Sequence, residues 1–124
     1  MMKSKSILVV DDTGINRLLP GLILRPFGWT VHEADGGLDV LSKLKEFDVA
    51  CVLLDISMPD ISGLDVLQNI RSFSEFAAIK VIAYTAYATD DDKDHLMGLG
   101  FDAVLIKPLT SNKLLEIINK SAAV

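Results

Sequence analysis

In the segment ILVVDD, Ile7 to Asp12, a run of branched apolar residues ends in two adjacent carboxylates. Branched apolar residues without polar alternation are typical of a strand covered on both faces of a sheet. Asp11 and Asp12 repel each other at the end of this strand unless a cation lies close by. Taken alone, the pair is better explained by capping of a following helix, by Asp12 or by Thr13.

Four further apolar segments resemble this one and alternate with segments in which apolar residues recur at helical spacing. We expect strands over residues 6–12, 30–34, 49–55, 80–85 and 103–107. The helical segments are marked by apolar residues within 18–23, 38–44, 66–70, 96–99 and 114–118. Strand and helix alternation requires parallel pairing with right-handed crossovers. The predicted class is α/β, a doubly wound (βα)5 five-stranded parallel sheet in a single domain over residues 1–124.

Local signals predict where some helices begin. Ser62 with Asp65, and Thr89 with Asp92, fit the capping pattern of a hydroxyl followed three residues later by an acid. Pro20 lies inside the first helical pattern, where a proline removes one hydrogen bond. We therefore expect a kink at Pro20 or a later start of that helix.

Composition narrows the class of protein. A chain of 124 residues is long enough for one core. Its net charge of -5 argues against direct nucleic-acid binding, and its apolar runs are too short for membrane insertion. The N-terminus does not fit a signal peptide, and the single cysteine, Cys51, forms no internal disulfide. We expect a cytoplasmic protein with a buried Cys51.

The polar residues that end the predicted strands form one group. The carboxyl end of the first strand carries Asp11 and Asp12; the third strand ends in Asp55, the fourth in Thr85 and the fifth in Lys107. In a parallel sheet of this kind, ligands bind at the carboxyl ends of the strands, so these side chains are expected to converge. Three carboxylates attract a hard dication such as Mg²⁺, which leaves room for phosphate oxygens. A carboxylate can itself accept a phosphoryl group, and the site therefore predicts magnesium-dependent phosphoryl transfer.

The motifs VVDD, LLDISMPDISG, AYTA and KPL occur in the order and spacing of the response-regulator receiver domain of two-component signalling, which the chain resembles over nearly its whole length. This resemblance implies the flavodoxin-like strand order 2-1-3-4-5. It implies that Asp55 is the phosphoacceptor and that Asp11, Asp12, Asp55 and the backbone carbonyl of Ser57 bind Mg²⁺. It further implies that Thr85 is the switch hydroxyl, that Lys107 contacts the phosphoryl group, and that the bond from Lys107 to Pro108 is cis.

The same resemblance implies partners, and the chain differs from many receiver domains at one position. The donor is a sensor histidine kinase or a histidine phosphotransfer protein, and the chain is a phosphoacceptor with autodephosphorylation, not a turnover enzyme. Because the chain stops soon after the fifth helix, we expect output by protein contact or by passing the phosphoryl group on. A downstream protein target is expected on the face of the fourth helix, fifth strand and fifth helix. Many receivers have a rotating aromatic residue three positions before the lysine, where this chain has Val104. Tyr84 and Tyr87 are the candidates to replace that ring.

Two other functions remain open from the sequence. Haloacid-dehalogenase-type phosphatases also use a strand-end aspartate with magnesium, but they need a second acid two residues later, where this chain has Thr13. A receiver-shaped interaction module that is not phosphorylated is the other alternative. The presence of Asp11, Asp12, Asp55, Thr85 and Lys107 together argues against it.

Overall fold

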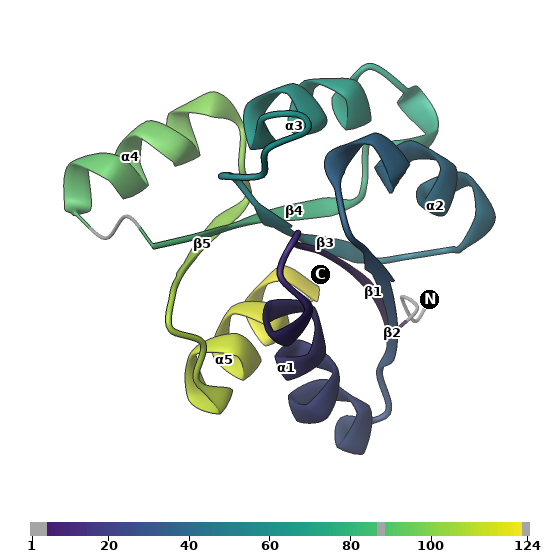
Figure 1. Cartoon of the computed structure of the whole chain (residues 1–124), viewed down its shortest axis with the longest axis vertical. Coiled ribbons are helices and arrows are strands. Elements are labelled where there is room, and N and C mark those ends of the chain that lie inside the picture. The colour runs from purple at the N-terminus through teal and green to yellow at the C-terminus, as the bar shows by residue number, and fades with distance from the viewer. Residues whose placement is uncertain (1–4, 87–88, 123–124) are drawn as a thin grey trace.

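The computed structural model describes residues 5–86 and 89–122 and has a central sheet between two layers of helices (Figure 1). The strands are β1 (Ser6–Val10), β2 (Thr30–Ala34), β3 (Cys51–Asp55), β4 (Lys80–Thr85) and β5 (Ala103–Ile106). The helices are α1 (Gly14–Leu24), α2 (Val40–Glu46), α3 (Gly63–Arg71), α4 (Asp90–Leu99) and α5 (Ser111–Ala122). Short 3-10 turns lie at Arg25–Phe27, Gly37–Asp39 and Ser74–Phe76. The predicted α/β class is confirmed.

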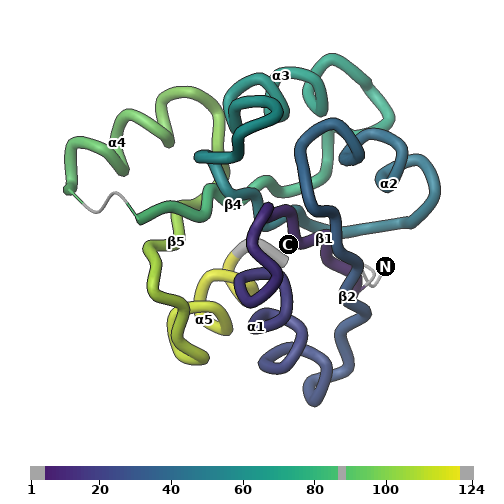
Figure 2. The backbone as a smooth tube through the Cα atoms, in the orientation of Figure 1, coloured from purple at the N-terminus to yellow at the C-terminus, as the bar shows by residue number. Residues whose placement is uncertain are grey.

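The sheet is parallel throughout, with strand order β2-β1-β3-β4-β5. This is the order that the family resemblance implied. The trace in Figure 2 shows α1 and α5 on one face, whereas α2, α3 and α4 cover the other. Because all strands run the same way, their carboxyl ends share one edge of the sheet.

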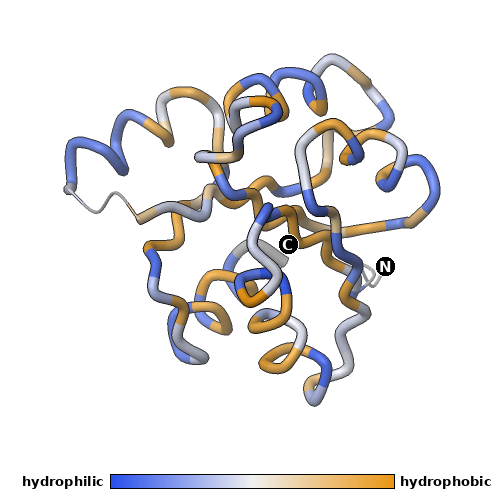
Figure 3. Tube along the Cα trace, in the orientation of Figure 1, coloured by the Kyte–Doolittle hydropathy of each residue, from blue (hydrophilic) through white to orange (hydrophobic). Residues whose placement is uncertain are grey.

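Alternate residues of the inner strands pack into two hydrophobic cores, one on each face of the sheet. Ile7 and Val9 of β1 pack into the cluster that includes residues of α1 and α5. Leu8 and Val10 pack into the cluster beneath α2, α3 and α4. Every residue of β1 and β3 is buried, and the hydropathy colouring in Figure 3 follows this apolar centre. The interpretation of these runs as strands covered on both faces is confirmed.

The predicted caps of α3 and α4 are present. The Ser62 hydroxyl accepts a hydrogen bond from the Asp65 backbone N–H at 3.2 Å. The Thr89 hydroxyl accepts one from the Asp92 N–H at 3.1 Å. Each bond satisfies a backbone donor that the first turn of a helix leaves without a partner.

The sequence predicted a kink at Pro20 or a later start of the first helix. The later start is wrong, because α1 begins at Gly14 and contains Pro20, and the kink stays a prediction. Pro20, Gly21 and Leu24 form the buried side of α1. Packing against the sheet contributes most of a helix's stability in a protein, and it offsets the hydrogen bond that the proline removes.

Cys51 is buried within β3, as expected, and burial raises the pKa of its thiol to about 12. Trp29 is also part of the core, at 8% exposure. In the described part of the chain, no helix is long and apolar enough to cross a membrane.

Asp60 joins the loop after β3 to the loop after β2. Its carboxylate accepts hydrogen bonds from the N–H groups of Leu38, at 3.2 Å, and Ile61, at 2.9 Å. A Cβ atom at Gly36 would lie 2.6 Å from the Asp60 Oδ2, so a larger residue at position 36 would displace the Asp60 carboxylate from these contacts. These contacts hold the loop that follows Asp55 against the loop that follows β2.

The burial of β3 predicts a large cost for truncating its core side chains. We expect Leu53→Ala, at a side chain with no exposed surface, to lower the free energy of unfolding by about 2–5 kcal/mol. Leu22→Ala on the exposed side of α1 is the matched control and should change it by less than about 0.5 kcal/mol. Urea denaturation followed by circular dichroism measures both; equal losses would contradict the assigned core.

Candidate functional site

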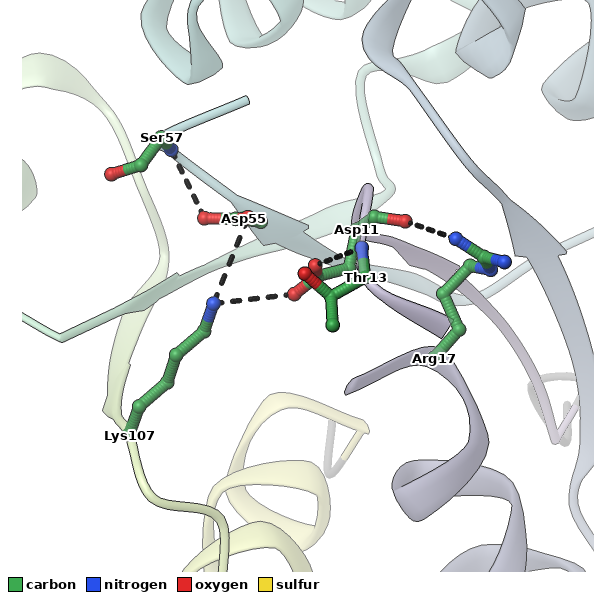
Figure 4. A network of polar contacts seen from close by, with 6 residues as sticks. All are labelled: Asp11, Thr13, Arg17, Asp55, Ser57 and Lys107. Atoms are coloured by element: carbon green, nitrogen blue, oxygen red, sulfur yellow. Dashed lines mark hydrogen bonds and ion pairs between the residues drawn. The ribbon is translucent and has the colours of Figure 1, made fainter. Parts of the chain in front are cut away.

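The strand-end residues predicted from the sequence converge at one edge of the sheet. Asp11 directly follows β1 and is fully buried, whereas its neighbour Asp12 is exposed. Asp55 ends β3 at 3% exposure and Thr85 ends β4 at 1%. Lys107 follows β5 and reaches back towards the acids (Figure 4). The arrangement follows from strands of nearly equal length in parallel register.

Lys107 connects two of the carboxylates. Its Nζ lies 3.3 Å from Asp11 Oδ2 and 3.6 Å from Asp55 Oδ2. On another side, the ammonium lies 4.8 Å from the centre of the Tyr84 ring. The backbone N–H of Lys107 donates to the Thr85 carbonyl at 2.7 Å, which joins β5 to the end of β4. The bond from Lys107 to Pro108 is cis, as the resemblance implied.

Three carboxylates form a potential metal site. Asp11, Asp12 and Asp55 each offer an oxygen, and these atoms lie within 4.8 Å of one another. Hard oxygen donors at this spacing suit Mg²⁺, which binds one or two carboxylates and keeps several waters. The predicted role of the Ser57 carbonyl stays a prediction; the backbone N–H of Ser57 donates to Asp55 Oδ1 at 3.0 Å.

The pKa of Asp55 is raised above its usual value, chiefly by burial of the carboxylate. The Ser57 N–H and the Lys107 ammonium oppose this shift, whereas the charges of Asp11 and Asp12 add to it. The ionised site is therefore electrostatically costly without a further cation. A bound dication would lower that cost, because it adds two positive charges among the three acids.

The turn after β1 is held by contacts that the sequence analysis missed. The Thr13 N–H donates to Asp11 Oδ1 at 2.9 Å, and Arg17 donates from Nη1 to the Asp11 carbonyl at 2.8 Å. Arg17 Nε also pairs with Glu33 at 3.4 Å. Thr13 is the N-cap residue of α1 and makes no side-chain cap bond. Asp12 is therefore not the N-cap, and helix capping does not account for the acid pair.

Tyr84 is a second residue of the site whose position the sequence analysis did not predict. Its side chain is 1% exposed, and burial together with the charges of Asp11 and Asp55 raises the pKa of its hydroxyl to about 12. Tyr84 precedes Thr85 on β4 and is paired in register with Asp55. The only sequence signal was an aromatic residue beside a strand-end hydroxyl. Tyr87, the other candidate ring, lies outside the described residues.

Comparison with known families identifies the chain. The family model of the response regulator receiver domain matches residues 7–119. The chain is a response regulator receiver domain. It is 34% identical over 119 residues to chemotaxis protein CheY-3 of Vibrio cholerae, which covers 95% of this chain and 92% of that protein.

Solved structures share the fold of this receiver domain. The receiver domain of sensor histidine kinase PA1611 from Pseudomonas aeruginosa, with magnesium coordinated in its active site cleft, has a TM-score of 0.86 at 23% identity. That match covers 98% of this chain and 99% of the other. The receiver domain of Saccharomyces cerevisiae Ssk1, crystallised with the histidine phosphotransfer protein Ypd1, has a TM-score of 0.87 at 23% identity. This match covers 98% of this chain and 91% of the other.

The family match favours the receiver over the phosphatase alternative. A phosphatase of the haloacid dehalogenase type needs an acid at position 13, and here the Thr13 backbone instead donates to Asp11. Receiver domains are phosphoacceptors and not turnover enzymes, which agrees with the sequence interpretation.

The raised pKa of Asp55 predicts how the stability of the metal-free protein depends on pH. Because the folded-state pKa lies above the unfolded value of 3.8, the folded state binds more protons between the two. The free energy of unfolding should therefore rise as pH falls through the folded pKa towards 3.8. Asp55→Asn should remove this part of the pH dependence and stabilise the protein at pH 7.

Denaturation at several pH values in the presence of EDTA measures the effect. Asp94→Asn, at an exposed aspartate on α4, is the control and should keep the wild-type dependence. A pH dependence that is the same in wild type and Asp55→Asn would contradict the assigned electrostatics.

Proposed function

We propose that this receiver domain accepts a phosphoryl group on Asp55 from a phosphohistidine and then changes its contacts with a protein target. The observation that carries the proposal is the position of the Asp55 carboxylate, which lies between an acid cluster and an ammonium group. Asp55 ends β3 at the edge of the sheet formed by the carboxyl ends of the strands, where an incoming phosphoryl group would meet Lys107 and Thr85.

In the proposed step, an Asp55 carboxylate oxygen attacks the phosphorus of the phosphohistidine. A P–O bond forms as the P–N bond breaks, and the electron pair of that bond returns to the imidazole nitrogen. The Lys107 ammonium, which now contacts Asp55 Oδ2 at 3.6 Å, contacts a phosphoryl oxygen in the product. The Thr85 hydroxyl donates to another. Phosphoryl transfer depends mainly on positioning and charge stabilisation, which these two residues supply.

The acid pair and Asp55 would hold Mg²⁺ together with the Ser57 carbonyl. The ion would neutralise charge on the phosphoryl oxygens and would offset the repulsion among the three carboxylates. Asp12 is the exposed member of the set and is the more accessible ligand. Asp11 is buried and oriented by Thr13 and Lys107.

The donor is a histidine kinase or a histidine phosphotransfer protein, by analogy with the Ssk1 receiver and Ypd1. The target is expected to bind over α4, β5 and α5. Met97 and Leu99 of α4 support this assignment, since they are 47% and 36% exposed and offer apolar surface to a partner. Autodephosphorylation by water completes the cycle, and its rate is expected to depend on Ser57 and on Tyr87, which lies outside the described residues.

Incubation with acetyl phosphate and Mg²⁺ tests the phosphoacceptor directly. We expect one acyl phosphate, mapped to Asp55 by mass spectrometry after reductive trapping. Asp55→Asn should abolish it, and omission of Mg²⁺ should reduce it at least about tenfold because the carboxylates then repel the donor. Asp94→Asn should be labelled like the wild type. Absence of labelling in the wild type would favour the interaction module that is not phosphorylated.

Structures with and without the phosphoryl mimic beryllofluoride test the switch. The side chain at position 104 is a valine with no ring to rotate, so we expect Thr85 and residues 86–90 to move towards the mimic. If these residues superimpose in the two structures, the proposed switch is wrong. A complex of Asp55→Asn with the same reagents is the control.

A further inference from the structure

Among the residues that the structure describes, three side chains contact the Lys107 ammonium, and they are of two chemical kinds. Two are carboxylate oxygens, of Asp11 at 3.3 Å and Asp55 at 3.6 Å. The third is the face of the Tyr84 ring, whose centre lies 4.8 Å from Nζ. A cation at this distance is attracted by the negative face of an aromatic ring.

The ring is fixed more firmly than the lysine. Tyr84 is 1% exposed and packs in the core cluster beneath α1 and α5, with Leu105, Leu114 and Ile118 among its members. On the sheet it is paired in register with Asp55 on β3 and Leu105 on β5. Lys107 has a long, flexible side chain that is 22% exposed. Ordering such a side chain costs conformational entropy, which a rigid contact reduces.

The three contacts differ in what happens during the proposed reaction. Asp11 and Asp55 are the residues that would bind the metal, and Asp55 would be esterified. Both carboxylate contacts of the ammonium are therefore weakened or replaced as the site fills. The ring carries no charge to be neutralised and is not a metal ligand. The proposed transfer step therefore does not remove its contact with Lys107.

We propose that Tyr84 is a positioning residue whose ring holds the Lys107 ammonium beside Asp55 for contact with the phosphoryl group. This inference rests on the proposed function of Asp55 and Lys107. The sequence analysis considered Tyr84 as a replacement for the rotating aromatic residue that is missing at Val104. Here its ring instead stays in place under Lys107. Its buried position in the core supports a fixed ring.

The proposal assigns the effect to the ring and not to the hydroxyl. Tyr84→Phe keeps the ring, whereas Tyr84→Leu removes it and keeps an apolar core residue. With acetyl phosphate and saturating Mg²⁺, we expect Tyr84→Leu to be phosphorylated about threefold to tenfold more slowly, as befits a contact of this type. Tyr84→Phe should be phosphorylated at the wild-type rate, because it keeps the ring. Tyr84→Met serves as a second ring-less variant if the leucine variant does not fold.

A double-mutant cycle separates positioning from general damage to the site. In a Lys107→Ala background, replacing Tyr84 by Leu should cause no further slowing, because the group that the ring holds is gone. The affinity for Mg²⁺, measured by titration without phosphodonor, should be unchanged by Tyr84→Leu. Equal slowing in both backgrounds, or a loss of rate in Tyr84→Phe as large as in Tyr84→Leu, would overturn the proposal.

A readout that does not need phosphorylation keeps this inference distinct from the proposed function. The ε-methylene protons of Lys107 should show an upfield ring-current shift in NMR spectra of the wild type and Tyr84→Phe, and none in Tyr84→Leu. Absence of the shift in the wild type would refute the ring contact. If the shift is present but Asp55 is never phosphorylated, the proposed function fails while the contact stands.

Discussion

Like-charge repulsion among three carboxylates is the constraint around which this receiver domain is organised. Parallel pairing of β1 with β3 places buried Asp11 and Asp55 at the same edge, and Asp12 lies beside them. The fold tolerates this because Lys107 contacts two of the acids and backbone N–H groups of Thr13 and Ser57 donate to the same two. Burial, followed by the charges of Asp11 and Asp12, raises the pKa of Asp55, and the remaining negative charge favours a bound cation at this site.

The supporting contacts divide into those that hold the acids and those that hold the lysine. Arg17 binds the Asp11 carbonyl and pairs with Glu33, so it links α1 to the end of β2. Asp60 ties the loop after β3 to the loop after β2. Tyr84 packs beneath Lys107 from within the core. Rigid support of this kind is what phosphoryl transfer requires, since the reaction depends on placement more than on covalent assistance by the protein.

Much of the fold could be predicted because its signals are local. Apolar runs such as Ile7 to Val10 and Cys51 to Leu54 indicated strands covered on both faces, and Ser62 and Thr89 indicated helix starts. Predictions failed where packing outweighs local preference. Residues 11 and 12 were assigned to the first strand, yet the strand ends at Val10, and α1 runs through Pro20 because its buried side packs on the sheet.

The alternation of strands and helices and the polar residues at the strand ends could be predicted from the sequence, because both depend on neighbours along the chain. With the rule that parallel strands end at one edge, the sequence also predicted the group of Asp11, Asp12, Asp55, Thr85 and Lys107. The strand order came from family resemblance and not from the pattern itself. The packing of Tyr84 under Lys107 and the contact of Arg17 with the Asp11 carbonyl became visible in the three-dimensional structure. The first contact joins residues far apart in sequence and the second spans the turn into α1, and both depend on side-chain directions that packing selects.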